Sequence, residues 1–238
     1  MRDEWSEYDG GMSGAVRRGR PPRTSRDAIF DAVLRVGFDQ ATTSAVAALL
    51  GIEQSTLYGH VASREDMLDG ATGRALSRIA WPEPGEDWAA YLRDCAEAMW
   101  ALFAANPGLA RRLRAMNTVP DAVVVQSCRV VAYLTVRLGI DVREAALIVD
   151  AIADLTVDSY LTVEALDDAA DDGRRRRDQV WDAMVAAGEV AADPGIIAEY
   201  LEVMRVAMGE PGAPSDWWRH KIDLVIDGVR LRVAGGSR

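Results

Sequence analysis

The chain has 238 residues, and 49% of them are hydrophobic. This is enough for one domain of ordinary size with a sizeable core and for a second, smaller domain. Its formal net charge of −10 argues against a nucleic-acid binder unless the basic residues are concentrated in one place, because affinity for DNA comes largely from neutralising phosphates. No apolar run approaches the roughly 18 residues of a membrane span, and the acidic start does not resemble a signal peptide, so we expect a cytoplasmic protein without a membrane partner.

Residues 1–22 are rich in glycine and proline and predict a disordered arm. The arm contains a basic segment, because Arg17, Arg18 and Arg20 begin a stretch of ten residues that holds five arginines and no acid. The distribution of charge matters more than its sum, so this segment can supply sequence-independent affinity for DNA. The alternative is a solvated tail that binds nothing.

The rest of the chain has the apolar spacing of helices, and no alternating strand pattern occurs, so the predicted fold is all-α. Ser25 can cap a first helix that ends at Gly37, and Ser63 can cap a fourth that extends to about residue 80. Between them, short helices are expected at 43–50 and 54–61. After a Pro/Gly break at 81–87, further helices are expected at 88–105, 107–116, 121–138, 141–166 (with Asp141 as its cap), 178–187, 195–208 and 216–233.

The segment 43–61 has the pattern of a helix-turn-helix. Val46, Ala47 and Leu50 form the inner face of its first helix, and the small Ala47 lets the second helix cross closely. Gly51 suits a turn position with positive φ. The second helix then exposes side chains that can reach a major groove, namely Gln54, Ser55, Tyr58, Gly59 and His60.

The run TTSAVAALLGIEQSTLYGHV, followed by SREDML, resembles the DNA-binding domain of the TetR family of transcriptional regulators. It is especially similar to that of the tetracycline repressors. The strong match covers about residues 24–72, and a weaker one extends through Asp87-Trp88 to the final WxxxIDLVIDGV pattern. The resemblance implies an N-terminal three-helix helix-turn-helix domain at 23–72 and a C-terminal helical ligand-binding and dimerisation domain at 73–238. It further implies a repressor without enzymatic activity or cofactor, which binds a pseudo-palindromic double-stranded DNA operator as a homodimer and is released by a small-molecule effector.

The resemblance also implies roles for individual residues in DNA binding. Thr43 should meet a phosphate, Gln54 and Thr56 should approach base edges or phosphates, and Tyr58 and His60 should contact the backbone. Ser44 and Gly59 depart from the tetracycline repressors, which carry an arginine and an aromatic residue there, so we expect a different operator. Arg64 stands where the family usually has a phosphate-binding lysine. The candidate DNA-binding residues are Arg17, Arg18, Arg20, Thr42, Thr43, Ser44, Gln54, Ser55, Thr56, Tyr58, Gly59, His60 and Arg64.

By the same resemblance, the effector should bind between the central helices, and two chains should pair through helices 141–166 and 216–233 as a four-helix bundle. The alternative is that these apolar faces pack within one chain. The dimer candidates are Val149, Ile152, Thr156, Tyr160, Trp217, Ile222, Val225, Ile226 and Val229. The ligand candidates, whose aromatic and Met members can equally be core, are Trp88, Met99, Trp100, Phe103, Met116, Asn117, Thr118, Tyr133, Asp154, Asp158 and Tyr160.

Several ligand and function classes are disfavoured or left open by specific residues. Tetracycline repressors hold a magnesium–tetracycline chelate with core histidines, but no histidine occurs between His60 and His220, so we expect an apolar, metal-free effector. Asp154 and Asp158 can orient a ligand, bind a metal or pair with arginines. The sequence contains no phosphate loop, no GxSxG motif and no HExxH motif, so none of these motifs indicates an enzyme. Cys95 and Cys128 leave open a thiol redox sensor of the same fold, and a protein-binding adaptor with a vestigial DNA domain is a third alternative.

Overall fold

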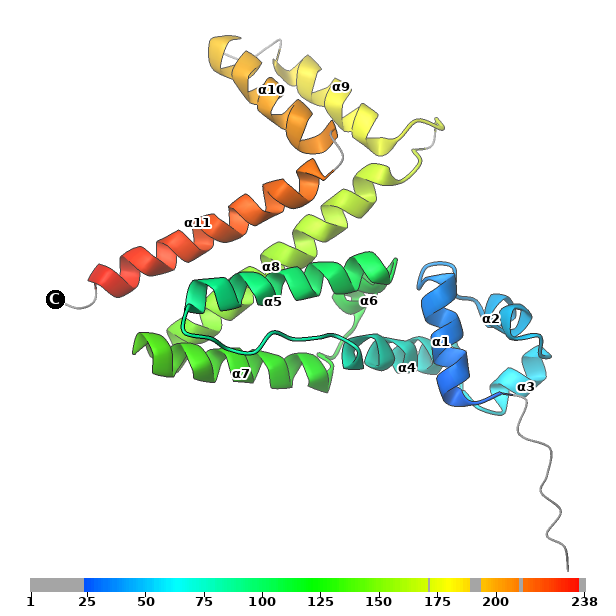
Figure 1. Ribbon diagram of the computed structural model, residues 1–238. Coiled ribbons are helices and arrows are strands. Elements are labelled where there is room, and N and C mark those ends of the chain that lie inside the picture. The colour runs from blue at the N-terminus through cyan, green and yellow to red at the C-terminus, as the bar shows by residue number, and fades with distance from the viewer. Residues whose placement is uncertain (1–23, 171, 189–193, 210–211, 236–238) are drawn as a thin grey trace, which may run out of the picture.

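The computed structural model describes residues 24–170, 172–188, 194–209 and 212–235, and within these ranges the chain is helical, without a strand (Figure 1). The prediction of an all-α fold is confirmed. The helices are α1 (Arg26–Val36), α2 (Thr43–Leu50), α3 (Gln54–Tyr58), α4 (Arg64–Ser77), α5 (Trp88–Ala105), α6 (Leu109–Ala115), α7 (Asp121–Leu138), α8 (Val142–Asp167), α9 (Arg176–Gly188), α10 (Pro194–Gly209) and α11 (Ala213–Gly235).

The helix ends follow local chemistry. Side-chain oxygens of Ser25, Ser63 and Asp141 accept the backbone N–H groups of Ala28, Asp66 and Glu144 at 3.2, 3.1 and 2.8 Å, which confirms all three predicted caps. Three helices are shorter than the sequence predicts, and α4, expected to extend to about residue 80, ends at Ser77. The α3 helix ends at Tyr58, and the Leu57 carbonyl accepts the amides of His60 and Val61 at 2.9 and 3.2 Å. The α6 helix begins only after Gly108, whose φ is +81°.

The helices form two connected groups (Figure 1). Helices α1 to α3 surround one end of α4, and α5 to α8 pack together beside them. The α9–α10 hairpin projects from the far end of α8, and α11 returns along α8. The boundary expected after residue 72 falls inside α4, which is continuous to Ser77. The core around α1 also continues past this boundary, because Phe103 and Leu109 belong to it.

Close approach of α1 and α4 depends on Gly70. A Cβ at this position would lie 2.1 Å from the Phe30 ring of α1. Since the ring is 9% exposed and belongs to the core, it has little room to move. We expect Gly70→Ala to destabilise the chain by about 1–3 kcal/mol in denaturant unfolding, the usual cost of overpacking.

Gly73 of the same helix supplies the matched control. It is exposed, and a Cβ there would meet no atom within 4 Å. Gly73→Ala should stabilise α4 by roughly 0.5–1 kcal/mol, since alanine is the better helix former. Equal effects of the two substitutions would contradict the close packing of α1 on α4.

Trp218 of α11 is the centre of the second core. It is 1% exposed and stacks on Trp100, with ring centroids 4.4 Å apart. Its indole Nε1 donates to Thr156 Oγ1 of α8 at 3.2 Å, and that hydroxyl in turn donates to the Ile152 carbonyl at 2.7 Å. Both polar groups of this contact are therefore satisfied inside one chain.

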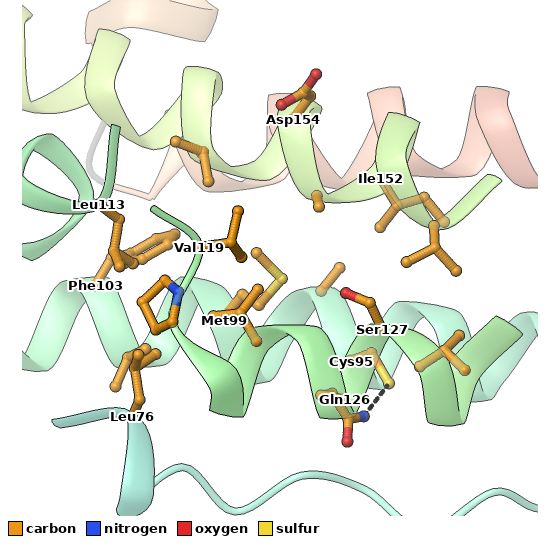
Figure 2. A pocket seen from close by; sticks show the side chains of 18 of the residues that line it. Leu76, Cys95, Met99, Phe103, Leu113, Val119, Gln126, Ser127, Ile152 and Asp154 are labelled. Carbon is orange, nitrogen blue, oxygen red and sulfur yellow. Dashed lines mark hydrogen bonds between the residues drawn. The ribbon is translucent and has the colours of Figure 1, made fainter. Parts of the chain in front are cut away.

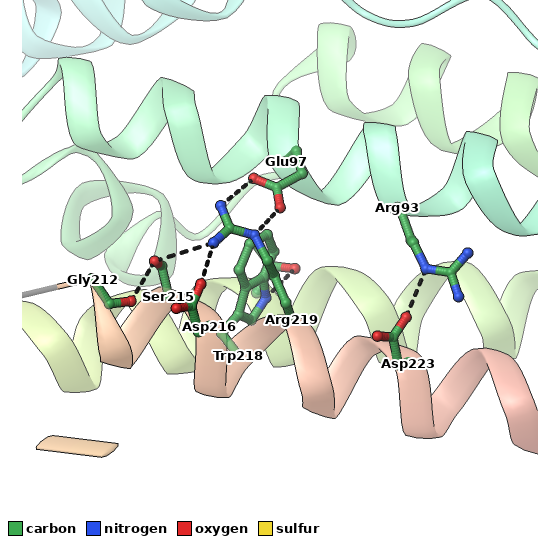
Figure 3. A network of polar contacts seen from close by, with 9 residues as sticks. Arg93, Glu97, Gly212, Ser215, Asp216, Trp218, Arg219 and Asp223 are labelled. Carbon is green, nitrogen blue, oxygen red and sulfur yellow. Dashed lines mark hydrogen bonds and ion pairs between the residues drawn. The ribbon is translucent and has the colours of Figure 1, made fainter. Parts of the chain in front are cut away.

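Ion pairs add to this contact at the edge of α11 (Figure 3). Arg219 donates to Glu97 at 2.5 Å and to Asp216 at 2.7 Å, and Arg93 donates to Asp223 at 2.6 Å. Since these pairs are partly exposed, each contributes little to stability. The packing of α11 against α5 and α8 therefore depends mainly on buried apolar surface around Trp218.

The position of α11 corrects part of the predicted dimer surface. Thr156, Ile222, Ile226 and Val229 are all buried within the single chain. Val149 and Ile152 line an internal cavity, and the half-buried Tyr160 packs on Trp100 and Phe103. These seven residues are therefore core or cavity residues. Only Trp217, 38% exposed, and the half-buried Val225 keep surface that a second chain can reach.

Candidate DNA interface and effector cavity

The turn between α2 and α3 has the geometry that the sequence predicts. Gly51 lies in the left-handed region, with φ +64° and ψ +35°. The following amide, that of Ile52, donates to the Ala47 carbonyl at 3.1 Å and closes the end of α2. Ala47 and Leu57 are buried where the two helices meet. The pair α2–α3 is therefore a packed helix-turn-helix.

The outer face of this pair carries the polar residues expected there. Ser44, Gln54, Ser55, Thr56, Tyr58 and Gly59 are exposed, as is Thr42, and His60 is half-buried. Thr42 caps α2 through the Ala45 amide at 3.1 Å. Thr43 is 9% exposed, so little of its side chain is available to a phosphate.

Gln54 is tied to α2 in the absence of DNA. Its Nε2 donates to Thr43 Oγ1 at 2.5 Å. Reading both hydrogen-bonding atoms of an adenine edge requires the amide nitrogen and the oxygen together. Because the amide nitrogen carries two hydrogens, Gln54 can keep the bond to Thr43 with one of them and use the other, together with its oxygen, to read adenine.

Two arginines outside the helix-turn-helix hold it in place. Arg64 Nε donates to the Ala41 carbonyl at 3.0 Å, just before α2. Arg26 donates to the His60 carbonyl at 2.8 Å and pairs with Asp66 at 3.0 Å. Asp66 also accepts the Ala62 amide at 2.8 Å, and this bond, followed by the Arg26 contact, lowers the pKa of its carboxyl. Asp66 is therefore charged at neutral pH and fixes the α3–α4 connection.

The helix-turn-helix supplies almost no positive charge of its own. Residues 43–58 contain no lysine or arginine and one acid, Glu53. Arg64 is exposed nearby but pairs with Glu65 at 3.6 Å. Phosphate neutralisation must therefore come mostly from other segments, and the arm arginines Arg17, Arg18 and Arg20 are the candidates in the sequence. They lie outside the described residues.

A cavity of about 240 Å³ lies between α4, α5, α6, α7 and α8 (Figure 2). Its wall is mainly apolar, with Leu76, Met99, Phe103, Leu113 and Val157 among the lining side chains. The polar groups are few: Cys95, Gln126, Ser127 and Thr118, with Arg114 and Asp154 at one side. Mostly apolar walls with a small number of polar groups are typical of small-molecule sites.

The cavity includes only part of the predicted ligand set. Met99, Phe103, Met116, Thr118 and Asp154 line it. Trp88, Trp100, Asn117, Tyr133, Asp158 and Tyr160 do not, because each of them has another place in the fold. Trp100 stacks on Trp218 and Tyr160, the Tyr133 hydroxyl donates to the Gly85 carbonyl at 2.8 Å, and Asn117 is exposed.

Sequence reasoning missed the two polar residues that α7 presents to the cavity. Gln126 is 7% exposed although it is polar, and Ser127 follows it. The signal was present in the sequence, because Gln126 falls at helical spacing among Val123, Val130 and Leu134. A polar residue on an apolar face needs a partner.

Helix α6 connects the cavity to the DNA-binding helices through its arginines. Arg114 lines the cavity and pairs with Asp154 at 3.3 Å and Asp158 at 3.1 Å on α8, so pairing with arginine is the correct alternative for these two acids. Two residues earlier, Arg112 pairs with Glu65 at 2.6 Å and Asp69 at 2.5 Å on α4. A movement of α6 would therefore be transmitted to the first turns of α4 through the ion pairs of Arg112.

The cysteines lack the features of a redox switch. Cys95 is 7% exposed, and burial raises the pKa of its thiol to about 11. A peroxide sensor requires the opposite, an accessible thiol with a lowered pKa. Cys128 is exposed. The redox alternative therefore has no support in the structure.

The described residues give no sign of a metal site or of a membrane span. They contain no group of three or more His, Cys, Asp or Glu side chains placed to hold a metal ion. No histidine lines the cavity, so its residues do not fit a magnesium–tetracycline chelate of the kind held by histidines. None of the described helices is both long and apolar enough to cross a membrane.

Comparison with known proteins gives the same class from sequence and from fold. No family model matches the chain. Tetracycline repressor protein class D of Escherichia coli is 25% identical over 230 residues, which cover 91% of this chain and 96% of that protein. An HTH-type transcriptional repressor of Mycobacterium tuberculosis is 26% identical over 121 residues, 50% of this chain and 42% of the relative.

Solved structures share the whole architecture. The TetR family protein ActR of Streptomyces coelicolor, without ligand, is similar with a TM-score of 0.66 at 19% identity, over 91% of this chain and 99% of that one. The packed α2–α3 pair on an all-α body defines a helix-turn-helix transcriptional regulator. The chain is similar to the tetracycline repressors in sequence and to TetR family proteins in fold, and it is a transcriptional repressor of the TetR type.

Proposed function

We propose that this repressor binds a pseudo-palindromic double-stranded DNA operator as a homodimer and releases it when a small, mostly apolar effector occupies the cavity. In this proposal residues 1–22 and 23–72 bind DNA, while residues 73–238 bind the effector and the second chain. The observation that carries it is the position of α6. One arginine of α6 lies on the cavity and another holds α4, which is separated from α3 by five residues.

Release follows from a difference in affinity between two conformations. An effector shifts the repressor only if it prefers the conformation whose α3 helices no longer match the spacing of the major grooves. A preference of about 100-fold, worth roughly 2.7 kcal/mol, suffices to release a modestly bound operator. ActR, whose fold this chain shares, was solved with actinorhodin, which supports a small molecule as the signal.

The direct test is a mobility shift with the DNA upstream of the chain's own gene. We expect a shift that survives excess random DNA and is reversed by a compound that binds the cavity. Binding to random DNA alone, or none at any salt concentration, would contradict a repressor role and favour an adaptor whose DNA domain is vestigial.

Gln54 should select sequence rather than supply general affinity. We expect Gln54→Ala to weaken binding at the preferred operator by about 1–3 kcal/mol, the value of a base contact, and to leave binding to random DNA unchanged. Gln179→Ala, on the exposed surface of α9, is the matched control and should change neither. An equal loss on operator and random DNA would show that Gln54 contacts only the backbone.

The arm should act in the opposite way. Replacing Arg17 and Arg18 by Ala should weaken binding to every DNA sequence and reduce the slope of log affinity against log salt by about 0.9 per residue. The reason is the shortage of cations on residues 43–58. Titrations at four salt concentrations measure this slope, and an unchanged slope would exclude the arm from phosphate contact.

A further inference from the structure

One end of the cavity contains buried polar groups with weak partners. Among the described residues, the Gln126 amide donates only to Cys95 Sγ, at 3.9 Å (Figure 2). Sulfur is a weak acceptor. The Tyr91 hydroxyl is buried beside the Cys95 thiol and the Gln126 amide without good hydrogen-bond geometry to either, and Tyr91 itself does not line the cavity. Buried polar groups are nearly always paired with good geometry, so the Gln126 amide on the cavity wall, held only by weak contacts, can gain a stronger hydrogen bond from a ligand.

Ser127 adds a second polar group to the same wall. It follows Gln126 on α7 and lines the cavity, and its hydroxyl makes no hydrogen bond to another described residue. Around these groups the wall is apolar, with Leu92, Ala96 and Val130 among the lining residues. A molecule in the cavity therefore meets hydrogen-bonding groups at one place and hydrocarbon elsewhere.

The charged side of the cavity does not favour an anion. Arg114 is the one cation among the described lining residues, and its guanidinium pairs with both Asp154 and Asp158. Two carboxylates for one guanidinium leave this side with a net negative charge. An anionic ligand would lose its hydration without gaining a free cation, which is costly.

The volume limits the size of the ligand. An engineered cavity of about 150 Å³ accepts benzene, which has six carbon atoms. At about 240 Å³, this cavity accommodates on the order of ten non-hydrogen atoms at the same density. That is the size of two small fused rings.

We propose that the effector is an uncharged, mostly apolar molecule of about this size that carries one hydroxyl or carbonyl oxygen, and that Gln126 and Ser127 select this oxygen. The inference rests on the proposed function, because it assigns the chemistry of the effector cavity. The amide of Gln126 can donate to a carbonyl or accept from a hydroxyl, so either form of oxygen is bound. Met99 and Phe103 cover the hydrocarbon part.

Three probes that share one ring system test this selection by calorimetry in buffer with EDTA. Tetralin has no oxygen, tetralone adds a neutral carbonyl, and the carboxylate of tetrahydronaphthoic acid adds a charge. We expect tetralone to bind about five- to ten-fold more tightly than either of the others, in keeping with one neutral hydrogen bond. Tightest binding of the carboxylate, equal binding of tetralone and tetralin, or no binding of any probe would overturn the proposal.

Variants on α7 assign the selection to its residues. Gln126→Leu should remove the preference for tetralone over tetralin and leave the affinity for tetralin within about threefold. Ser127→Ala should reduce the preference in part, and it carries the test if Gln126→Leu does not fold. Cys128→Ala, exposed on the same helix, is the control and should keep the preference. A preference retained in both cavity variants would overturn the assignment.

The two proposals can fail separately. Operator binding without probes tests the repressor, and calorimetry without DNA tests the cavity. If the chain binds no operator but prefers tetralone through Gln126, the proposed function is wrong and the inference about the cavity stands. If it binds operator but shows no such preference, the inference is wrong and the repressor remains.

Discussion

A chain that carries Leu224→Arg and Leu231→Arg is expected to fold, to be monomeric, and to bind its operator at least about 100-fold more weakly than the unaltered chain. These leucines are 74% and 76% exposed on α11. With Gly228, also exposed, they lie one and two turns apart on one helix face. On α8, Leu147 is 58% exposed as well. Two helices that expose leucines in this way commonly pack against the same two helices of a second chain as a four-helix bundle.

The size of the effect comes from the two-fold symmetry of the operator. A dimer gains contacts to two half-sites, whereas a monomer gains contacts to one. An arginine placed between two chains must also leave water without a partner, which is costly. Light scattering measures the mass, a thermal melt checks the fold, and a mobility shift measures the affinity.

Two further variants serve as controls for this result. Val125→Arg with Val136→Arg adds the same charge on the exposed face of α7 and should leave the dimer intact. Ile226→Arg should instead unfold the chain, because Ile226 is fully buried within it. A double Leu224 and Leu231 variant that stays dimeric would exclude this face of α11 from the interface.

The sequence predicted best where local chemistry decides the structure. Gly51 adopts a positive φ and Ser63 caps α4 as expected, because a turn or a cap depends on residues only a few positions apart. The limits of α5 and α7 also agree with the predicted ranges, since a Pro/Gly break or a cap marks their ends. The resemblance to TetR DNA-binding domains was carried by this same local region.

The sequence could not decide which apolar face of a helix meets which neighbour. On α11, Ile226 is buried in its own chain and Leu224 is exposed, yet both are aliphatic residues in one apolar run. On α5, Trp100 and Phe103 are both at helical spacing, but only Phe103 lines the cavity. The periodicity of apolar residues predicts that one face of a helix is buried, but it does not identify the helix or chain that buries this face. Several dimer and ligand candidates are therefore buried in the core, whereas the described DNA candidates other than Thr43 are exposed or half-buried, and both sets stay predictions.

The cavity and the DNA-binding helices are also linked by contacts that no motif encodes. Arg112 and Arg114 are ordinary arginines in the sequence, and their partners on α4 and α8 lie at least forty residues away. The pKa of Arg112 is raised although partial burial opposes this, because Asp69 and Glu65 both accept hydrogen bonds from it. Such charge-assisted pairs are the strong ones, so α6 and the start of α4 should move together.

Trp218→Ala is expected to have a large effect on stability without preventing folding. We expect a loss of about 3–5 kcal/mol in the free energy of unfolding, the usual cost of removing a buried tryptophan, and a fall in Tm of roughly 6–20 °C. The loss has three sources: the stacking on Trp100, the hydrogen bond to Thr156, and the cavity left between α5, α8 and α11.

Trp218→Phe separates these sources. It keeps an aromatic ring against Trp100 and removes the N–H that bonds Thr156, whose hydroxyl still donates to the Ile152 carbonyl. We therefore expect a loss of about 1–2 kcal/mol, near the value of one buried hydrogen bond with some lost packing. Melts must be run at several chain concentrations, because the stability of a dimer includes its association. A Trp218→Ala chain as stable as the unaltered one at every concentration would show that α11 is not held to α5 and α8 by this residue. The dimer surface assigned to its outer face would then lose its support.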